Sequence, residues 1–201
     1  MNAPSSMRRI CVLALLLATF AGIGPASATE RNSAATFYVA QLSGESGWED
    51  VLVNPILSEY VEAYLVAAAL SRRYRTYSEG AWQLEAEGQV AYNFGAQRHW
   101  ELNVVPVVAR WNSLPWWRSR IASSVAFGLG LSYATRLPPI EVALEGESSQ
   151  LLIYWLAELT AGPLEGPWAV SVRLHHRSVG YGLMGDEGGM NAMGIGVRYS
   201  F

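Results

Sequence analysis

Strict alternation of side-chain character near the C-terminal end constrains the fold of this chain more than any other feature. In residues 168–178 and again in residues 191–201, most residues at every second position are large and apolar or aromatic, and those between them are small or charged. Successive side chains of a β-strand point to opposite faces, so each segment would have one apolar face. An apolar outside that alternates with a small or polar inside is typical of a membrane β-barrel.

Eight alternating segments can be counted, and they predict an all-β fold, an eight-stranded antiparallel transmembrane β-barrel. Most have the length that a tilted strand needs to cross a bilayer. Gly and Ala are frequent on the expected inner face, which suits a narrow barrel, and aromatic residues gather near segment ends, as in interfacial girdles. A soluble sandwich also alternates, but these features favour the membrane. The segments span residues 35–42, 60–72, 81–94, 99–111, 119–133, 150–161, 168–178 and 191–201.

The N-terminal segment has the three parts of a secretory signal: basic residues at Arg8 and Arg9, an apolar run over residues 10–23, and the small residues Ala26-Ser27-Ala28. We therefore expect a signal peptide at residues 1–28 and one outer-membrane barrel domain at residues 29–201. The single cysteine, Cys11, falls inside the signal. The mature chain would then have no disulfide and no cysteine-based metal site.

Composition supports the same assignment. Hydrophobic residues make up 51% of the chain and charged residues 15%, whereas roughly 25% charged residues is usual for a soluble domain. The net charge of −3 gives no indication of nucleic-acid binding. No His or Asp cluster in the mature chain has the spacing of metal ligands, so we expect neither metal nor cofactor. A secreted, aromatic-rich chain of this kind is predicted to lie in the outer membrane of a Gram-negative cell as an integral barrel.

Charged residues on the expected inner face are balanced in sign. Buried charges must be paired, so we interpret them as a plug of paired charges that fills the narrow lumen. A channel is less favoured, because an eight-stranded barrel has no open pore. With both termini in the periplasm, the long extracellular links would be residues 43–59, 134–149 and 179–190. The inward charges are Glu85, Glu87, Glu101, Glu158, Arg173, His175, Arg177 and Arg198.

Two polar residues interrupt the apolar face of the seventh segment at its extracellular end. His176 and Ser178 are two positions apart and therefore share a face, with their Cβ atoms roughly 6–7 Å apart. A histidine base can take the proton of a serine hydroxyl and turn it into a nucleophile. Polar groups that face lipid are costly, which favours a functional reason. The alternative interpretation is that both groups hydrogen-bond to lipid headgroups or water.

The last thirty-five residues or so resemble the PagL-type lipid A deacylases and their broader acyloxyacyl hydrolase relatives. The resemblance lies in the pattern R-L-H-H-R-S at residues 173–178, the Gly-rich segment after it and the pattern G-I-G-V-R-Y-S-F at residues 194–201. It implies an outer-membrane barrel that removes the ester-linked acyl chain at the 3 position of lipid A in lipopolysaccharide. His176 would be the general base and Ser178 the nucleophile, facing the membrane. The resemblance also allows a homodimer.

Two positions depart from the family pattern. The family follows the serine with Asn, where this chain has Val179, and carries a catalytic Glu at the start of the last strand, where this chain has Asn191. Glu187 lies four residues earlier with the same parity, so we expect it as the third catalytic residue, with its neighbour Asp186 as the alternative. Backbone N–H groups of Gly180 or of the Gly188-Gly189 pair are candidate oxyanion donors.

Two functions therefore compete. One is an outer-membrane esterase, a lipid A 3-O-deacylase that acts by a Ser-His-acid mechanism. The other is a non-catalytic small barrel with a structural or interaction role and a degenerate triad. A carboxylate within hydrogen-bond reach of His176 would favour the enzyme, and its absence would favour the second function.

Overall fold

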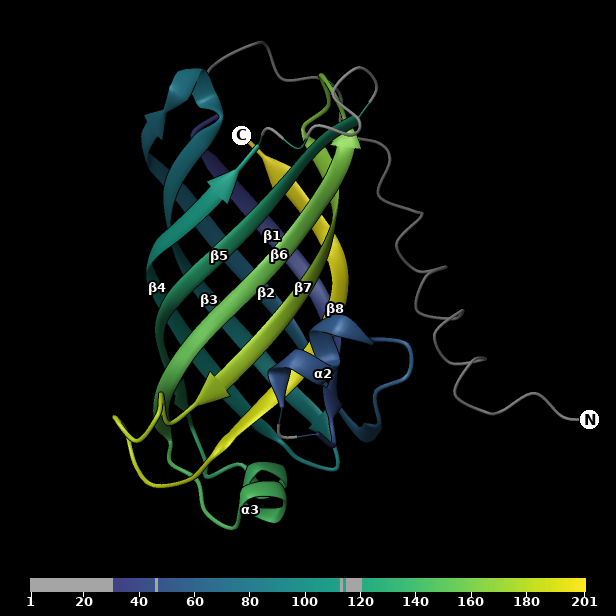
Figure 1. Cartoon of the computed structure of the whole chain (residues 1–201), viewed down its shortest axis with the longest axis vertical. Coiled ribbons are helices and arrows are strands. Elements are labelled where there is room, and N and C mark those ends of the chain that lie inside the picture. Colours follow the sequence, from purple (N-terminus) through teal and green to yellow (C-terminus); the bar gives the residue numbers. More distant parts are fainter. Residues whose placement is uncertain (1–30, 46, 113, 115–120) are drawn as a thin grey trace, which may run out of the picture.

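The computed structural model describes residues 31–45, 47–112, 114 and 121–201. Eight antiparallel strands close into a barrel in which each strand pairs with its sequence neighbours and the first pairs with the last (Figure 1). The predicted eight-stranded fold is confirmed, whereas the predicted signal at residues 1–28 lies outside the described residues. The strands are β1 (Ser33–Ser43), β2 (Tyr60–Tyr77), β3 (Trp82–Gly95), β4 (His99–Trp111), β5 (Ile121–Ala134), β6 (Leu151–Pro163), β7 (Trp168–Ser178) and β8 (Gly189–Ser200).

The strand bounds agree with the alternation, apart from β2. Strands β4 and β7 have the predicted bounds, but β2 continues past Arg72 to Tyr77. Arginines interrupt the apolar alternation there, yet the ladder to β3 goes on until Tyr77 pairs with Trp82. The sequence pattern ends earlier than the strand because this extension carries no apolar face.

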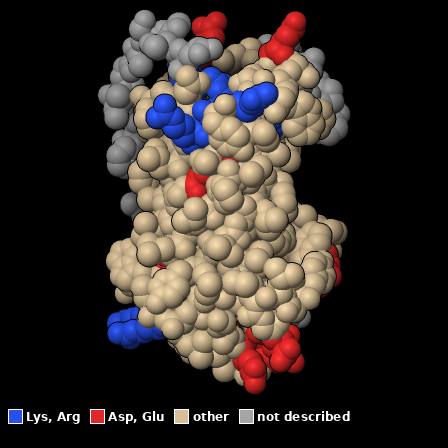
Figure 2. Space-filling view, turned by 90° about the vertical axis from the view of Figure 1, so that its left-hand side faces the viewer, with Lys and Arg blue, Asp and Glu red and all other residues tan. Residues whose placement is uncertain are grey.

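The outer wall of the barrel is a belt of apolar side chains. Its members include Phe127, Leu129 and Leu131 on β5, each about half exposed. Figure 2 shows one face of this belt, almost free of charged side chains between charged groups at the two ends. Aromatic pairs border it, such as Trp82 with Trp111 at the end that carries the termini. None of the helices in the described part of the chain is long and apolar enough to cross a membrane.

Ion pairs fill the lumen, which confirms the interpretation of the inward charges as a paired plug. Arg173 is fully buried and bonds Glu87 at 2.6 Å and Glu158 at 2.5 Å. Nearer the termini, Glu85 accepts hydrogen bonds from both Arg110 and Arg198. Toward the other end, His175 bonds Glu101 through Nε2 at 3.0 Å. Each buried charge therefore offsets another in a medium where an unpaired charge would be costly.

Two links at the far end from the termini contain short helices that the sequence pattern did not predict. Helix α2 (Trp48–Val53) lies against the outer wall of the barrel, and helix α3 (Pro139–Glu145) lies across the barrel end (Figure 1). Glu141 of α3 is buried and accepts a 2.8 Å hydrogen bond from Arg177 in the lumen. Burial raises the pKa of the Glu141 carboxyl, and the guanidinium of Arg177 opposes that rise. Helix α3 thus closes the end of the barrel with a buried ion pair.

Replacing Arg173 by methionine should destabilise the barrel strongly. The change removes the cation between Glu87 and Glu158. Breaking a buried pair from one side typically costs about 3–5 kcal/mol. Urea unfolding in detergent micelles would measure the loss, with Arg72→Met as an exposed control that should change the free energy of unfolding little. Adding Glu87→Gln to Arg173→Met should recover part of the loss; no recovery would contradict the charge-pairing account.

Candidate active site

The two histidines of β7 lie on opposite sides of the barrel wall. His175 points into the lumen, where its Nδ1 lies 2.9 Å from the Tyr38 hydroxyl. His176 points outward, and its ring packs on the ring of Trp155 at a centroid distance of 4.5 Å. Ser178, the last residue of β7, follows on the outward side and is half-buried. The sequence-predicted pair therefore lies on the outer wall near the end away from the termini.

The His176 imidazole is held by Asn191 of β8. The two residues are direct partners across the β7–β8 ladder, and His176 Nδ1 lies 2.6 Å from Asn191 Oδ1. The Asn191 amide nitrogen donates to the backbone carbonyl of Glu45 at 3.2 Å, so the amide oxygen faces the imidazole. An oxygen acceptor at Nδ1 places the ring proton on that nitrogen and leaves Nε2 as the basic atom. This is the tautomer that a general base requires.

The Ser178 hydroxyl lies at the start of a tight turn. The backbone N–H of Gly180 donates to Ser178 Oγ at 3.4 Å. Gly180 has a φ of +61°, and a Cβ there would lie 2.7 Å from Cγ1 of Ile153, so this turn requires glycine. No hydrogen bond joins Ser178 to His176 in the described structure, although the two side chains are two residues apart on one face of the strand.

His176 is covered, whereas the sequence led us to expect a side chain that faces lipid. It is only 7% exposed, and Leu174 below it on the same face is 1% exposed. Helix α2 lies over this part of the wall, with Trp48 making an edge contact to Trp155 at 5.4 Å. The cover comes from the link between β1 and β2, which has no strand alternation and gave no indication of a helix.

Glu187 lies apart from this group. Its side chain is exposed and its carboxylate is beside Gly146, at the C-terminal end of α3. Asp186 is exposed as well, whereas Gly189 pairs with Ser178 across the ladder. The structure therefore brings together His176, Ser178, Asn191 and Gly180, and it leaves Glu187 and Asp186 on the β7–β8 link. Glu187 as a catalytic acid stays a prediction that requires this link to move.

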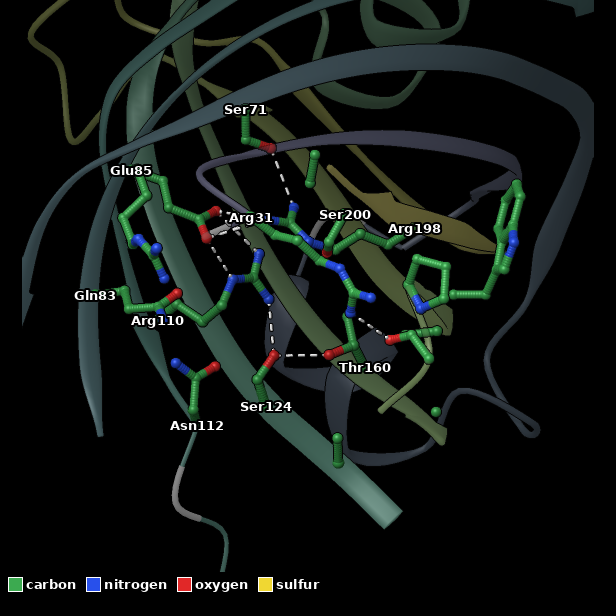
Figure 3. Close-up of a pocket in the computed structure, with 18 of the residues that line it drawn as sticks. Arg31, Ser71, Gln83, Glu85, Arg110, Asn112, Ser124, Thr160, Arg198 and Ser200 are labelled. Carbon is green, nitrogen blue, oxygen red and sulfur yellow. Dashed lines mark hydrogen bonds and ion pairs between the residues drawn. The ribbon is translucent and has the colours of Figure 1, made fainter. Parts of the chain in front are cut away.

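A second polar region lies inside the barrel at the opposite end (Figure 3). A cavity of about 390 Å³ opens there. Its charged groups already bond one another: Glu85 accepts from Arg110 at 3.0 Å and from Arg198 at 2.9 Å. In the described parts of the chain, no group of three His, Cys, Asp or Glu side chains could hold a metal ion. The outer-wall group therefore remains the candidate for chemistry.

Comparison with solved structures supports the architecture. The crystal structure of the outer membrane enzyme PagL matches with a TM-score of 0.51 and 14% sequence identity, over 83% of this chain and 99% of that chain. The shared fold is that of an outer-membrane β-barrel. No protein-family model and no curated protein sequence matches this chain.

Two contributors to the site were missed at the sequence level. Trp155 lies on the apolar face of its strand, where the sequence does not distinguish it from other lipid-facing aromatic residues. Trp48 lies in a link that has no periodic pattern. The contact of Trp155 with His176 could have been predicted. Strands β6 and β7 pair antiparallel, and counting back from the tight turn at residues 164–167 places Trp155 opposite His176. Nothing comparable indicated the contact between Trp48 and Trp155.

Proposed function

We propose that this protein is an outer-membrane esterase that removes the ester-linked acyl chain at the 3 position of lipid A. The observation that carries the proposal is the hydrogen bond from His176 Nδ1 to Asn191, with Ser178 two residues further along the same outer face. The imidazole is thereby oriented as a base beside a serine hydroxyl. The group lies on a wall of apolar side chains, so a lipid ester would reach the half-buried Ser178 sideways through the membrane, with His176 covered by helix α2 beside it.

The proposed reaction begins with Ser178. Its Oγ attacks the acyl carbonyl carbon while the hydroxyl proton passes to His176 Nε2. The tetrahedral intermediate carries an oxyanion, for which the candidate donor is the Gly180 N–H, which donates to Ser178 Oγ in the structure. The C–O bond to the sugar then breaks, and His176 returns its proton to the sugar oxygen that leaves. Water, deprotonated by the same imidazole, releases the fatty acid from Ser178.

Asn191 takes the place of the carboxylate in this scheme. An amide oxygen can orient the imidazole and fix its tautomer, as asparagine does in the Cys-His-Asn proteases, although it adds no negative charge to stabilise an imidazolium. The bond from its amide nitrogen to the Glu45 carbonyl keeps the oxygen toward His176. The proposal therefore assigns orientation, and no charge stabilisation, to Asn191.

Asn191 and Glu187 give opposite expectations for alanine variants. Asn191→Ala removes the acceptor from His176 Nδ1 and should lower kcat by about 10²- to 10⁴-fold, because the ring loses its tautomer and orientation. Glu187→Ala, on the exposed link, should change kcat little. Initial rates of fatty-acid release in lipid A micelles would measure both. A large loss in Glu187→Ala with an active Asn191→Ala would restore Glu187 as the acid.

Mass spectrometry of lipid A tests the function itself. Lipid A from Gram-negative cells that express the protein should lose one hydroxyacyl group relative to cells with the empty vector. Folding of the protein in those membranes would be checked by its altered mobility on unheated electrophoresis gels. Unchanged lipid A beside folded protein would contradict the proposal.

The non-catalytic barrel is the second candidate. The observations that favour it are the absence of a hydrogen bond between Ser178 and His176 and the lack of a carboxylate at the imidazole in the described residues. The rate at which purified protein hydrolyses a short-chain ester, such as p-nitrophenyl butyrate, distinguishes the esterase from the non-catalytic barrel. Hydrolysis abolished by Ser178→Ala supports the esterase, and a rate equal to that of the Ser178→Ala variant supports the second candidate.

A further inference from the structure

Helix α2 covers the outer wall of the barrel near the end away from the termini. On the outward face of β7, Val170 and Val172 are 52% and 40% exposed, and exposure falls to 1% at Leu174. The covered stretch thus begins four residues before the end of β7 at Ser178. At ~3.3 Å per residue this is about 13 Å along the strand. When the barrel spans the membrane, the segment that covers this stretch of wall lies next to the outer leaflet.

The C-terminal end of α2 and the turn that follows it expose several large apolar side chains. Val51 is fully buried beneath it, whereas Leu52 and Val53 are 45% and 73% exposed. In the turn after Pro55, Ile56 is 92% exposed and Leu57 is 80% exposed. Four large aliphatic side chains within six residues form one exposed patch. Such patches in proteins mark contact with an apolar partner or a membrane.

The helix that leads into this patch contacts the lipid-facing belt of the barrel. Trp48 touches Trp155, and Trp155 in turn packs on Phe127, which belongs to the exposed belt of β5. The acidic residues Glu49 and Asp50 lie in the first turn of α2, ahead of the four aliphatic residues. Helix α2 is therefore joined to the lipid-facing belt through Trp48, and the exposed aliphatic residues 52–57 follow at its C-terminal end.

We infer that residues 52–57 form a membrane wedge: Leu52, Val53, Ile56 and Leu57 insert into the hydrocarbon of the outer leaflet beside the His176–Ser178 group. The partner is lipid acyl chains, and the driving force is the removal of four exposed aliphatic side chains from water. The inference is independent of catalysis, because it concerns where this segment lies and not what Ser178 does.

Single-cysteine labelling tests the wedge. In the Cys11→Ser background, which removes the single cysteine of the chain, Val53→Cys and Ile56→Cys would each carry the environment-sensitive dye NBD. Proteins reconstituted in phosphatidylcholine–phosphatidylglycerol vesicles would be exposed to doxyl-labelled phosphatidylcholine or to iodide. Leu129→Cys on the lipid-facing wall of β5 is the membrane control, and Leu137→Cys on the link before α3, equally about half exposed, is the water control.

The expected result is a loss of fluorescence with doxyl lipid at positions 53 and 56 as large as at position 129, together with protection from iodide. Quenching by iodide, as expected at position 137, would overturn the wedge. Protection from both quenchers that grows with the ratio of protein to lipid would assign the patch to a second copy of the chain and would also overturn it. Repeating the labelling in Ser178→Ala separates this outcome from that of the esterase proposal, because the fluorescence needs no hydrolysis.

Discussion

Replacing Ser178 by alanine is expected to abolish release of the hydroxy fatty acid from lipid A while the barrel still folds. The change removes the nucleophile and with it the covalent path. Loss of the serine from a triad costs on the order of 10⁶-fold in kcat. The folded state loses only the weak hydrogen bond from the Gly180 N–H at the end of β7.

Ser171→Ala is the matched control for this variant. Ser171 lies on the same strand, but it faces the lumen and donates to Glu158 at 3.0 Å. The same chemical change there should leave kcat nearly intact and cost about 1 kcal/mol of stability. Rates from liquid chromatography of the released fatty acid would be compared for both variants. Equal activity of Ser178→Ala and the unchanged protein would show that Ser178 is not the nucleophile.

The adjacent histidines should respond in opposite ways. His176→Ala is expected to lower kcat by as much as the serine variant, because the proton acceptor is gone. Its folding should change little, since the ring loses one hydrogen bond and the contact with Trp155. His175→Ala, by contrast, removes a lumen group that bonds both Glu101 and Tyr38, and should destabilise the barrel while leaving the chemistry in place.

Urea unfolding and lipid A hydrolysis, measured side by side on both histidine variants, check this contrast. Loss of activity in His175→Ala with unchanged stability would contradict the structural role given to His175 and the catalytic role given to His176. Loss of stability in His176→Ala as large as in His175→Ala would mean that the outward ring is chiefly a packing group.

The barrel could be predicted because the pattern that specifies each strand lies within a short stretch of sequence. A period of two residues decides which side chains face the lumen, and it placed Arg173 and His175 inside and His176 outside before any pairing was known. The ion pairs of the lumen could be predicted as well. Inward charges of both signs are shielded from water, so each must be offset by an opposite charge nearby.

The surroundings of the site could not be predicted in the same way. Helix α2 has six residues, too few for a helical period to stand out, and its place on the outer wall depends on contacts between distant parts of the chain, such as that of Trp48 with Trp155. The sequence could not place Glu187 and Asn191 relative to His176, because their positions depend on the register of β8. Parity allowed both residues, whereas only the β7–β8 ladder places Asn191 directly opposite His176.

The bond between Asn191 and the Glu45 carbonyl joins residues 146 positions apart and has a bearing on biogenesis. Glu45 follows the first strand and Asn191 belongs to the last, and these strands meet only when β1 pairs with β8. Before the barrel closes, Asn191 therefore lacks the acceptor that fixes its amide oxygen toward His176. If the protein is the esterase proposed above, the imidazole becomes fully oriented only on closure, so an unfinished molecule in transit would be less active toward the lipids that it meets.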